Sequence, residues 1–170
     1  MERIINSELM DLEVILSLYV KAIEFQKSIQ SNHWHDFDAA LLEREIREHR
    51  HWKIMEGKEI ACIYSVAYQD PMIWGERDQH PSIYLHRIVT NPNFMGRRYV
   101  KEVVAWAMNY GKANGKSFIR LDTFGANKKL NDYYERCGFV FCGIKSFKSS
   151  DEVPRHYLDG ELSLLEIKIQ

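Results

Sequence analysis

The stretch from Ser82 to Gly143 constrains the fold most, because strand and helix patterns alternate along it without a break. Residues 82–90 (SIYLHRIVT) and 117–123 (SFIRLDT) are rich in apolar and β-branched side chains, which favour strands. Between them, from about Val100, apolar side chains recur at helical spacing. Over the whole chain this alternation predicts an α/β fold with one mixed, twisted sheet of about seven strands.

Residues 91–98 (NPNFMGRR) join the first of these strands to the helix. Pro92 and Gly96 forbid strand continuation and predict a turn. A helix that begins after such a turn offers unpaired backbone N–H groups and the positive end of its dipole. The sequence therefore predicts that this turn suits a phosphate group.

A second helix is predicted after the strand 117–123. Asn127 is the expected N-cap of a helix over residues 128–137, and Gly138 marks its end. The apolar and aromatic members of this helix are Leu130, Tyr133 and Tyr134. A strand over residues 139–144 closes the unit.

These two segments resemble the GNAT superfamily of acyl-CoA-dependent N-acyltransferases. One family pattern is an asparagine followed, seven positions later, by Tyr-Glu-(Lys/Arg)-x-Gly-Phe. Here Asn127 and residues 134–139 (YERCGF) match every defined position of this pattern. The other pattern, Gln/Arg-x-x-Gly-x-Gly/Ala on the pyrophosphate of coenzyme A, is degraded here. Met95, Arg98 and Val100 stand at its three defined positions.

The resemblance implies a single domain over residues 1–170, in which about four helices flank the sheet. Its sheet is expected to splay between the strand ending at Thr90 and the one beginning near Ser117, which leaves room for the pantetheine arm of coenzyme A. Acetyl-CoA or coenzyme A is the implied cofactor. The residues expected to contact it are Ile88, Val89, Thr90, Met95, Gly96, Arg97, Arg98, Tyr99, Val100, Asn127, Leu130 and Tyr133.

Attack of an amine on a thioester needs a proton acceptor, because an amine with a pKa of about 10 is mostly protonated at neutral pH. His86 lies on the same side of its strand as Thr90 by alternation and is a candidate base, with Tyr84 or a water chain as alternatives. The resemblance assigns Tyr134 the role of the acid that protonates the leaving thiolate. By the same analogy, the backbone of residues 88–90 donates to the oxyanion.

The N-terminal third predicts a strand at residues 1–6 and a helix from about Ser7 into the Lys27 region. Asp36 or Asp38 is the expected cap of a second helix. In the family, this helical pair flanks the entrance for the acceptor. Trp34, an aromatic side chain in a polar loop, is either a lid on the core or a wall of the acceptor pocket.

Residues 51–56 and 60–68 predict a hairpin whose second strand is central in the sheet. The following connection, residues 69–81, is too long for a simple turn and carries an apolar tip at Met72, Ile73 and Trp74. Such a tip usually binds a ligand or a neighbouring subunit, so it is expected to shape acceptor specificity or an interface. Residues 162–169 predict the final strand.

Two His-x-His pairs, His33 with His35 and His49 with His51, raise the possibility of a metal site. Catalytic zinc normally takes three protein ligands, and no cysteine or carboxylate lies at a supporting spacing. We therefore expect no metal and interpret these histidines as polar residues at helix ends.

Lysine and arginine total 23 against 24 aspartates and glutamates, which gives a net charge of −1. Such a balance argues against nucleic-acid or membrane partners. The three cysteines, Cys62, Cys137 and Cys142, lie in apolar stretches, and the N-terminus lacks a signal-peptide pattern. A cytoplasmic protein with reduced thiols is therefore expected.

Two functions remain open at this point. The first is an N-acetyltransferase that acts on a primary amine of a small molecule or an amino-acid-like acceptor, with a homodimer as one assembly that this reading allows. The second is a catalytically idle module that binds or senses acyl-CoA, which the degraded glycine pattern would permit.

Overall fold

A computed structural model describes residues 3–29, 33–35, 37–125, 127–148 and 160–170. The seven strands form one sheet in the order β1-β2-β3-β4-β5-β7-β6, which confirms the mixed α/β sheet. The chain divides into two compact units, residues 1–66 with 86–99 and residues 67–85 with 100–170. Strand β4 (Ser82–Thr90) contributes residues to both. None of the described helices is long and apolar enough to cross a membrane.

The first unit begins with β1, continues with two helices and returns as a hairpin. Its elements are β1 (Ile4–Asn6), a 3-10 turn (Leu9–Asp11), α1 (Leu12–Ser28), α2 (Ala39–Arg47), β2 (His51–Glu56) and β3 (Glu59–Ala67). The Asp38 carboxylate caps α2 by accepting a 2.9 Å hydrogen bond from the Ala40 amide, as predicted. Asp36, the alternative cap, lies outside the described residues.

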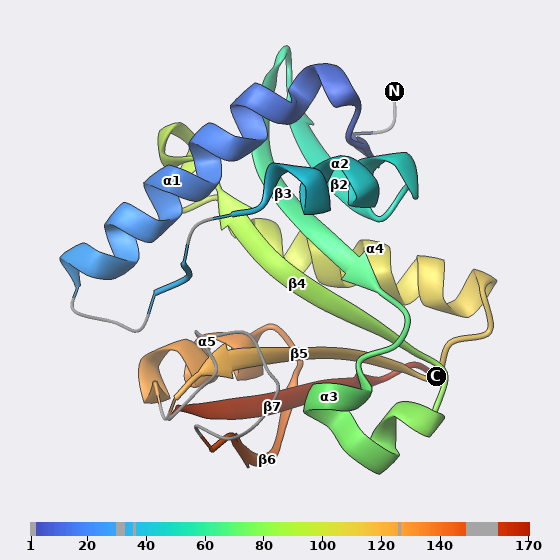
Figure 1. Cartoon of the computed structure of the whole chain (residues 1–170). Helices are drawn as coiled ribbons and strands as arrows, with labels where there is room; N and C mark the ends of the chain where they lie inside the picture. The colour runs from blue at the N-terminus through green and yellow to red at the C-terminus, as the bar shows by residue number, and fades with distance from the viewer. Residues whose placement is uncertain (1–2, 30–32, 36, 126, 149–159) are drawn as a thin grey trace. The chain divides into compact units, whose positions relative to one another are not determined.

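Helices α1 and α2 lie together over β3 in the first unit (Figure 1), and their apolar faces form its core. That core consists of Ile15, Leu18, Tyr19, Leu42, Ile46, Ile60, Ile63 and Val89. Strand β3 is buried from Ile60 to Val66, as expected for a central strand. Trp34 and Phe37 pack against this core, and their rings contact that of Tyr19.

Among its described residues, the second unit has three α-helices and three complete strands. They are α3 (Pro71–Trp74), α4 (Tyr99–Ala113, whose first residue belongs to the first unit), β5 (Phe118–Phe124), α5 (Lys128–Arg136), β6 (Val140–Ser146) and β7 (Glu161–Lys168). Strand β7 comes last in the chain but lies between β5 and β6, antiparallel to both (Figure 1). Strands β4 and β5 pair in parallel over residues 82–84 and 118–120, at the beginning of each strand.

Two of the three apolar residues at the tip of the connection 69–81 are buried within this chain, so less of the tip is open to a ligand or a neighbouring subunit than its composition indicated. Ile73 and Trp74 are each only 3% exposed and pack with Tyr84 in a second core, whereas Met72 is 45% exposed. Residues 71–74 form α3, an element that the sequence analysis did not predict. With α3, the described residues contain five α-helices, in keeping with the predicted number of about four.

Arg120 holds this connection onto the sheet. Its side chain is 2% exposed, lies 4.8 Å from the ring centre of Trp74 and pairs with Glu166 at 3.0 Å. One of its N–H groups donates a 2.6 Å hydrogen bond to the carbonyl of Arg77. A buried guanidinium with these partners is stable only when the loop is in place, because an unpaired buried charge is costly.

Candidate active site

The turn after β4 is anchored on β3 by Asn91. Its amide N–H donates to the Ala61 carbonyl and its side chain donates to the Ile60 carbonyl, each at 2.8 Å. The Asn91 side-chain oxygen also accepts from the Asn93 amide at 3.1 Å, which starts a 3-10 turn at Pro92. These bonds fix the position at which the turn leaves the sheet of the first unit.

The turn then adopts left-handed backbone at two positions. Gly96 has φ of 85° and Arg98 has φ of 59°. Glycine accepts such angles without steric cost, whereas other residues do so rarely. Arg98 stands where the family pattern has glycine, so this chain makes a left-handed turn there despite a side chain that disfavours it.

The exposed part of the turn is basic. Met95 is 62% exposed and the Arg97 side chain 57% exposed, and Arg98 is also exposed. Tyr99 and Val100, at 2% and 7%, point into the protein, so only their backbone can face a ligand. Exposed guanidinium groups beside the start of a helix fit an anion such as a pyrophosphate.

The C-terminal half of β4 offers mainly backbone to a ligand. Val89 is 5% exposed and belongs to the core under α1 and α2, so its predicted contact with a cofactor is limited to main-chain atoms. Ile88 and Thr90, which alternate with it along the strand, are partly exposed. Just before them, Arg87 has φ of 50°, a left-handed angle within a strand.

The candidate bases differ in how easily they accept a proton. Burial, with the charges of Arg87 and Arg50, lowers the pKa of His86 to about 4, so this imidazole is neutral at pH 7 but weakly basic. Tyr84 donates a 2.5 Å hydrogen bond to Asp78, and burial raises its pKa to about 12. A phenol that holds its proton so firmly is a poor proton acceptor at pH 7.

A pair of carboxyl groups in the second unit was missed by the sequence analysis. Carboxylate oxygens of Asp70 and Asp122 lie within 4.8 Å of one another. Burial and the neighbouring carboxylate raise the pKa of Asp122 to about 7, and burial raises that of Asp70 to about 6. The available signal was Asp122 itself, the one acidic residue in the strand segment 117–123.

Helix α5 carries the second matched pattern. The Asn127 side chain accepts a 3.1 Å hydrogen bond from the Leu130 amide, which confirms the predicted cap. The partly buried Tyr134 ring lies 5.8 Å from that of Phe139 at an edge-on angle of 85° and 5.7 Å from that of Tyr133. The helix thus holds the tyrosine ring between two aromatic neighbours.

Asn131, also missed, fixes α5 on the sheet. Its oxygen accepts from the Thr123 hydroxyl and its amide donates to the Ser163 hydroxyl, both at 2.9 Å. Thr123 and Ser163 are paired residues of β5 and β7, and Ser163 donates onward to the Gly125 carbonyl. These successive hydrogen bonds favour one position of α5 on the sheet.

The predicted site residues are divided between the units. His86, residues 88–90 and residues 95–99 belong to the first, and Val100, Asn127, Leu130, Tyr133 and Tyr134 belong to the second.

His51, from one of the two His-x-His pairs, uses both ring nitrogens within the protein. Ser7 Oγ lies 2.7 Å from Nδ1 and the Tyr19 hydroxyl 3.2 Å from Nε2. Burial lowers the pKa of this histidine to about 4. His51 is buried at the start of β2 and not at a helix end, which corrects the prediction for this histidine, and its contacts give it a structural role in the first unit.

Comparison with known proteins adds a family and a fold. The sequence profile described as the acetyltransferase (GNAT) family matches residues 19–139. A curated relative described as an uncharacterized N-acetyltransferase, YesJ from Bacillus subtilis, is 27% identical over 146 residues, which cover 78% of each protein.

Solved structures give the same fold. A GNAT-family acetyltransferase from Listeria monocytogenes superposes with a TM-score of 0.77 over 97% of this chain and 93% of its own, at 24% identity. The spermidine N-acetyltransferase from Vibrio cholerae, solved with CoA and spermine, gives a TM-score of 0.65 at 17% identity, covering 98% of this chain and 94% of its own.

Proposed function

Because this chain belongs to the acetyltransferase (GNAT) family, we propose that it transfers the acetyl group of acetyl-CoA to a primary amine of a small molecule or an amino-acid-like acceptor. The observation that carries the proposal is the exposed basic turn at residues 95–98, which leads into α4. We also propose that residues 1–170 form one such domain, which the 97% coverage by a GNAT structure supports.

In this proposal the backbone N–H groups of residues 95–100 donate to the pyrophosphate of coenzyme A, and Arg97 and Arg98 neutralise its charge. Both arginines have the exposure that this role needs. Acetyl-CoA supplies an acetyl group activated as a thioester. The amide groups of Ile88 to Thr90 donate to the acetyl oxygen as negative charge develops on it.

The amine must lose a proton when its nitrogen bonds to the acetyl carbon, and the sulfur must gain one when the carbon–sulfur bond breaks. We propose Tyr134 as the donor to sulfur. For the acceptor, His86 is neutral at pH 7, whereas the pKa of Asp122, about 7, is better matched to holding a proton transiently. A pH profile of turnover that shifts in Asp122→Asn but not in His86→Gln would select Asp122.

The alternative, an idle acyl-CoA-binding module, rests on the degraded turn pattern. The left-handed backbone at Gly96 and Arg98 argues against that alternative. The turn keeps this conformation at position 98 although arginine stands there in place of the glycine of the family pattern. The retained Asn127 cap of α5 argues in the same direction.

The test is release of free thiol from acetyl-CoA in the presence of a panel of amines. The panel contains polyamines, amino acids and their amides, because polyamines and α-amines present a primary amine in different charge settings. Amine-dependent thiol release supports the proposal. Binding of acetyl-CoA without turnover by any amine would support the idle module instead.

The proposed partner is therefore a small-molecule amine, and measurement of the molar mass in solution tests the proposed homodimer. A cytoplasmic location is our proposal too. It is supported by the three free cysteines, of which Cys62 is buried.

A further inference from the structure

Arg87 combines two features that are rarely found together. It lies inside β4, where extended backbone is the norm, yet its φ is 50°. A left-handed angle at a residue with a side chain is unfavourable and persists only where the surroundings impose it. The residues that follow, Ile88 to Thr90, therefore continue the strand in a direction that this one angle sets.

The surroundings of the Arg87 side chain supply such a constraint. Its Nη2 donates to both carboxylate oxygens of Glu45, each at 2.5 Å, and to the Ser65 hydroxyl at 2.9 Å. Ser65 in turn donates to Glu45 at 2.8 Å. Glu45 is 5% exposed and Ser65 is fully buried, so the guanidinium is tied to α2 and β3 by groups that cannot move into solvent.

Arg87, Glu45 and Ser65 all belong to the first unit, and two further details describe their contacts. The Arg87 Nε–H is buried and has no hydrogen-bond partner among the described residues. Burial, the largest single influence, opposes ionisation of Glu45, but the Arg87 charge and the hydrogen bonds from Arg87 and Ser65 together lower the pKa of Glu45, so the pair is ionised. The side chain is thus committed to Glu45 and Ser65 although one of its own donors stays unsatisfied.

We propose that Arg87 is a positioning residue that holds β4 in its left-handed kink through Glu45 and Ser65. The kink aims the backbone N–H groups of Ile88 to Thr90 at the acetyl oxygen. This inference rests on the proposed acetyltransferase function and assigns a role to a side chain that need not touch either substrate.

The experiment exploits the difference between glycine and alanine. Glycine adopts positive φ readily, whereas alanine does not, and neither replaces the guanidinium. Arg87→Gly and Arg87→Ala are therefore compared in a Glu45→Gln background, so that no unpaired carboxylate is left buried. The readouts are kcat, KM for acetyl-CoA, the melting temperature, and the backbone amide chemical shift of Ile88 in the free protein.

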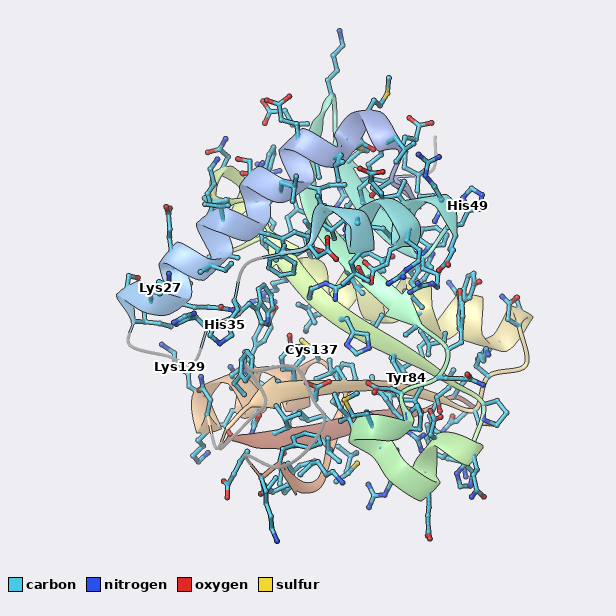
Figure 2. The ribbon with its side chains drawn as sticks, in the orientation of Figure 1. Lys27, His35, His49, Tyr84, Lys129 and Cys137 are labelled. Carbon is cyan, nitrogen blue, oxygen red and sulfur yellow. The ribbon has the colours of Figure 1, made fainter. Side chains whose placement is uncertain are left out.

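His49 provides the matched control, because it also has a positive φ, 56°, outside the site. Figure 2 shows it in the turn between α2 and β2, with its side chain directed away from the ribbon. His49→Gly and His49→Ala should differ in melting temperature in the same direction as the Arg87 pair. They should leave kcat unchanged.

We expect Arg87→Ala to lower kcat at least about tenfold with KM changed less than about threefold, and Arg87→Gly to recover most of that loss. The Ile88 amide shift should stay near its original value with glycine and move with alanine. Equal losses of kcat with an unchanged Ile88 shift in both variants would overturn the inference. If the unaltered protein transfers no acetyl group, the proposed function fails, while the Ile88 shifts still decide whether Arg87 holds the kink.

Discussion

The Tyr99 hydroxyl donates a 3.0 Å hydrogen bond to the Glu56 carboxylate and so ties the first residue of α4 to the end of β2. The same carboxylate oxygen lies 2.9 Å from a guanidinium nitrogen of Arg3 and 3.7 Å from one of Arg97. A negative charge therefore stands beside the turn that we propose for the pyrophosphate. It supports the turn but also competes for one of its arginines.

Glu56→Gln should strengthen binding of coenzyme A. Glutamine still accepts the hydrogen bond from Tyr99, but it removes a charge that repels the phosphates and holds Arg97. Since partly exposed charge pairs contribute about 0.2–1 kcal/mol, the dissociation constant should fall by a factor of about 1.4 to 5. Isothermal titration calorimetry at low and high salt checks this, and the gain should shrink at high salt. Weaker binding would show that Glu56 acts mainly by holding Tyr99.

Arg98→Gly should stabilise the protein even though it removes a side chain. The left-handed angle at Arg98 costs about 1–2 kcal/mol for a residue with a Cβ. Glycine recovers that cost but loses about 0.5–1 kcal/mol through its freer unfolded state. A net gain of about 0.5–1 kcal/mol is expected, and urea unfolding measures it. A loss of stability would mean that the Arg98 side chain makes contacts that outweigh the strain.

Arg98→Ala separates charge from backbone, since alanine keeps the strain and loses the guanidinium. Coenzyme A binding should weaken by about 1–2 kcal/mol, the scale of a hydrogen bond to a charged group. An unchanged dissociation constant at low salt would identify Arg98 as a solvated residue of the turn.

Local chemistry explains which parts of this structure the sequence could predict. The Asn127 cap, the β2–β3 hairpin and the strand Ser82–Thr90 depend on neighbours in the chain, so periodicity and capping rules locate them. Helix α3 was not predicted, because the burial of its Trp74 involves Arg120, which lies far away in the sequence.

The same limit applies to the candidate site. Arg87 and Glu45 are 42 positions apart, and Asp70 and Asp122 come from a loop and a strand that meet only through the fold. No spacing rule connects such pairs, because their distance in space depends on the sheet topology and not on their separation in the sequence. The family patterns located the turn and α5, which are each local.

Asn131→Leu should destabilise the protein and loosen α5. Leucine has a similar size, but it leaves the buried Thr123 hydroxyl without its acceptor and removes the donor to Ser163. A cost of about 1–3 kcal/mol in the free energy of unfolding is expected. Asp132→Asn on the same helix is the control, because Asp132 pairs only with the exposed Lys128 among the contacts described. That control should change stability by less than about 0.5 kcal/mol, and equal effects of the two variants would contradict the role of Asn131.

Asp122→Asn should change how stability depends on pH. In the folded protein the pKa of Asp122 is raised to about 7, whereas an unfolded aspartate has a pKa of about 3.9. Between these values the folded state holds a proton that the unfolded state has released. The contribution of this group is therefore complete below about pH 4 and is lost as the pH rises to about 7. Asparagine stays neutral throughout, so the melting temperature of the variant minus that of the unaltered protein should increase from pH 5 to pH 8. A constant difference would show that the carboxyl ionises normally.

Tyr134→Phe should keep coenzyme A binding and lower turnover. Phenylalanine preserves the ring that packs against Tyr133 and Phe139, so helix α5 and the fold should survive. Only the hydroxyl is lost, and with it the proposed donor to the leaving sulfur.

A phenol with a pKa of about 10 has little driving force to protonate a thiolate whose conjugate acid has a pKa of about 8.5. Its hydrogen bond to the developing charge on sulfur therefore matters more than complete proton transfer, and removal of such a donor costs about ten- to a thousandfold in rate. The rate constant at saturating acetyl-CoA, measured for both proteins with the same amine, checks this. Because the phenylalanine variant should bind coenzyme A with an unchanged dissociation constant, a loss of rate cannot then be ascribed to weaker binding. Equal rate constants would exclude Tyr134 as the donor and leave protonation of the thiolate to solvent.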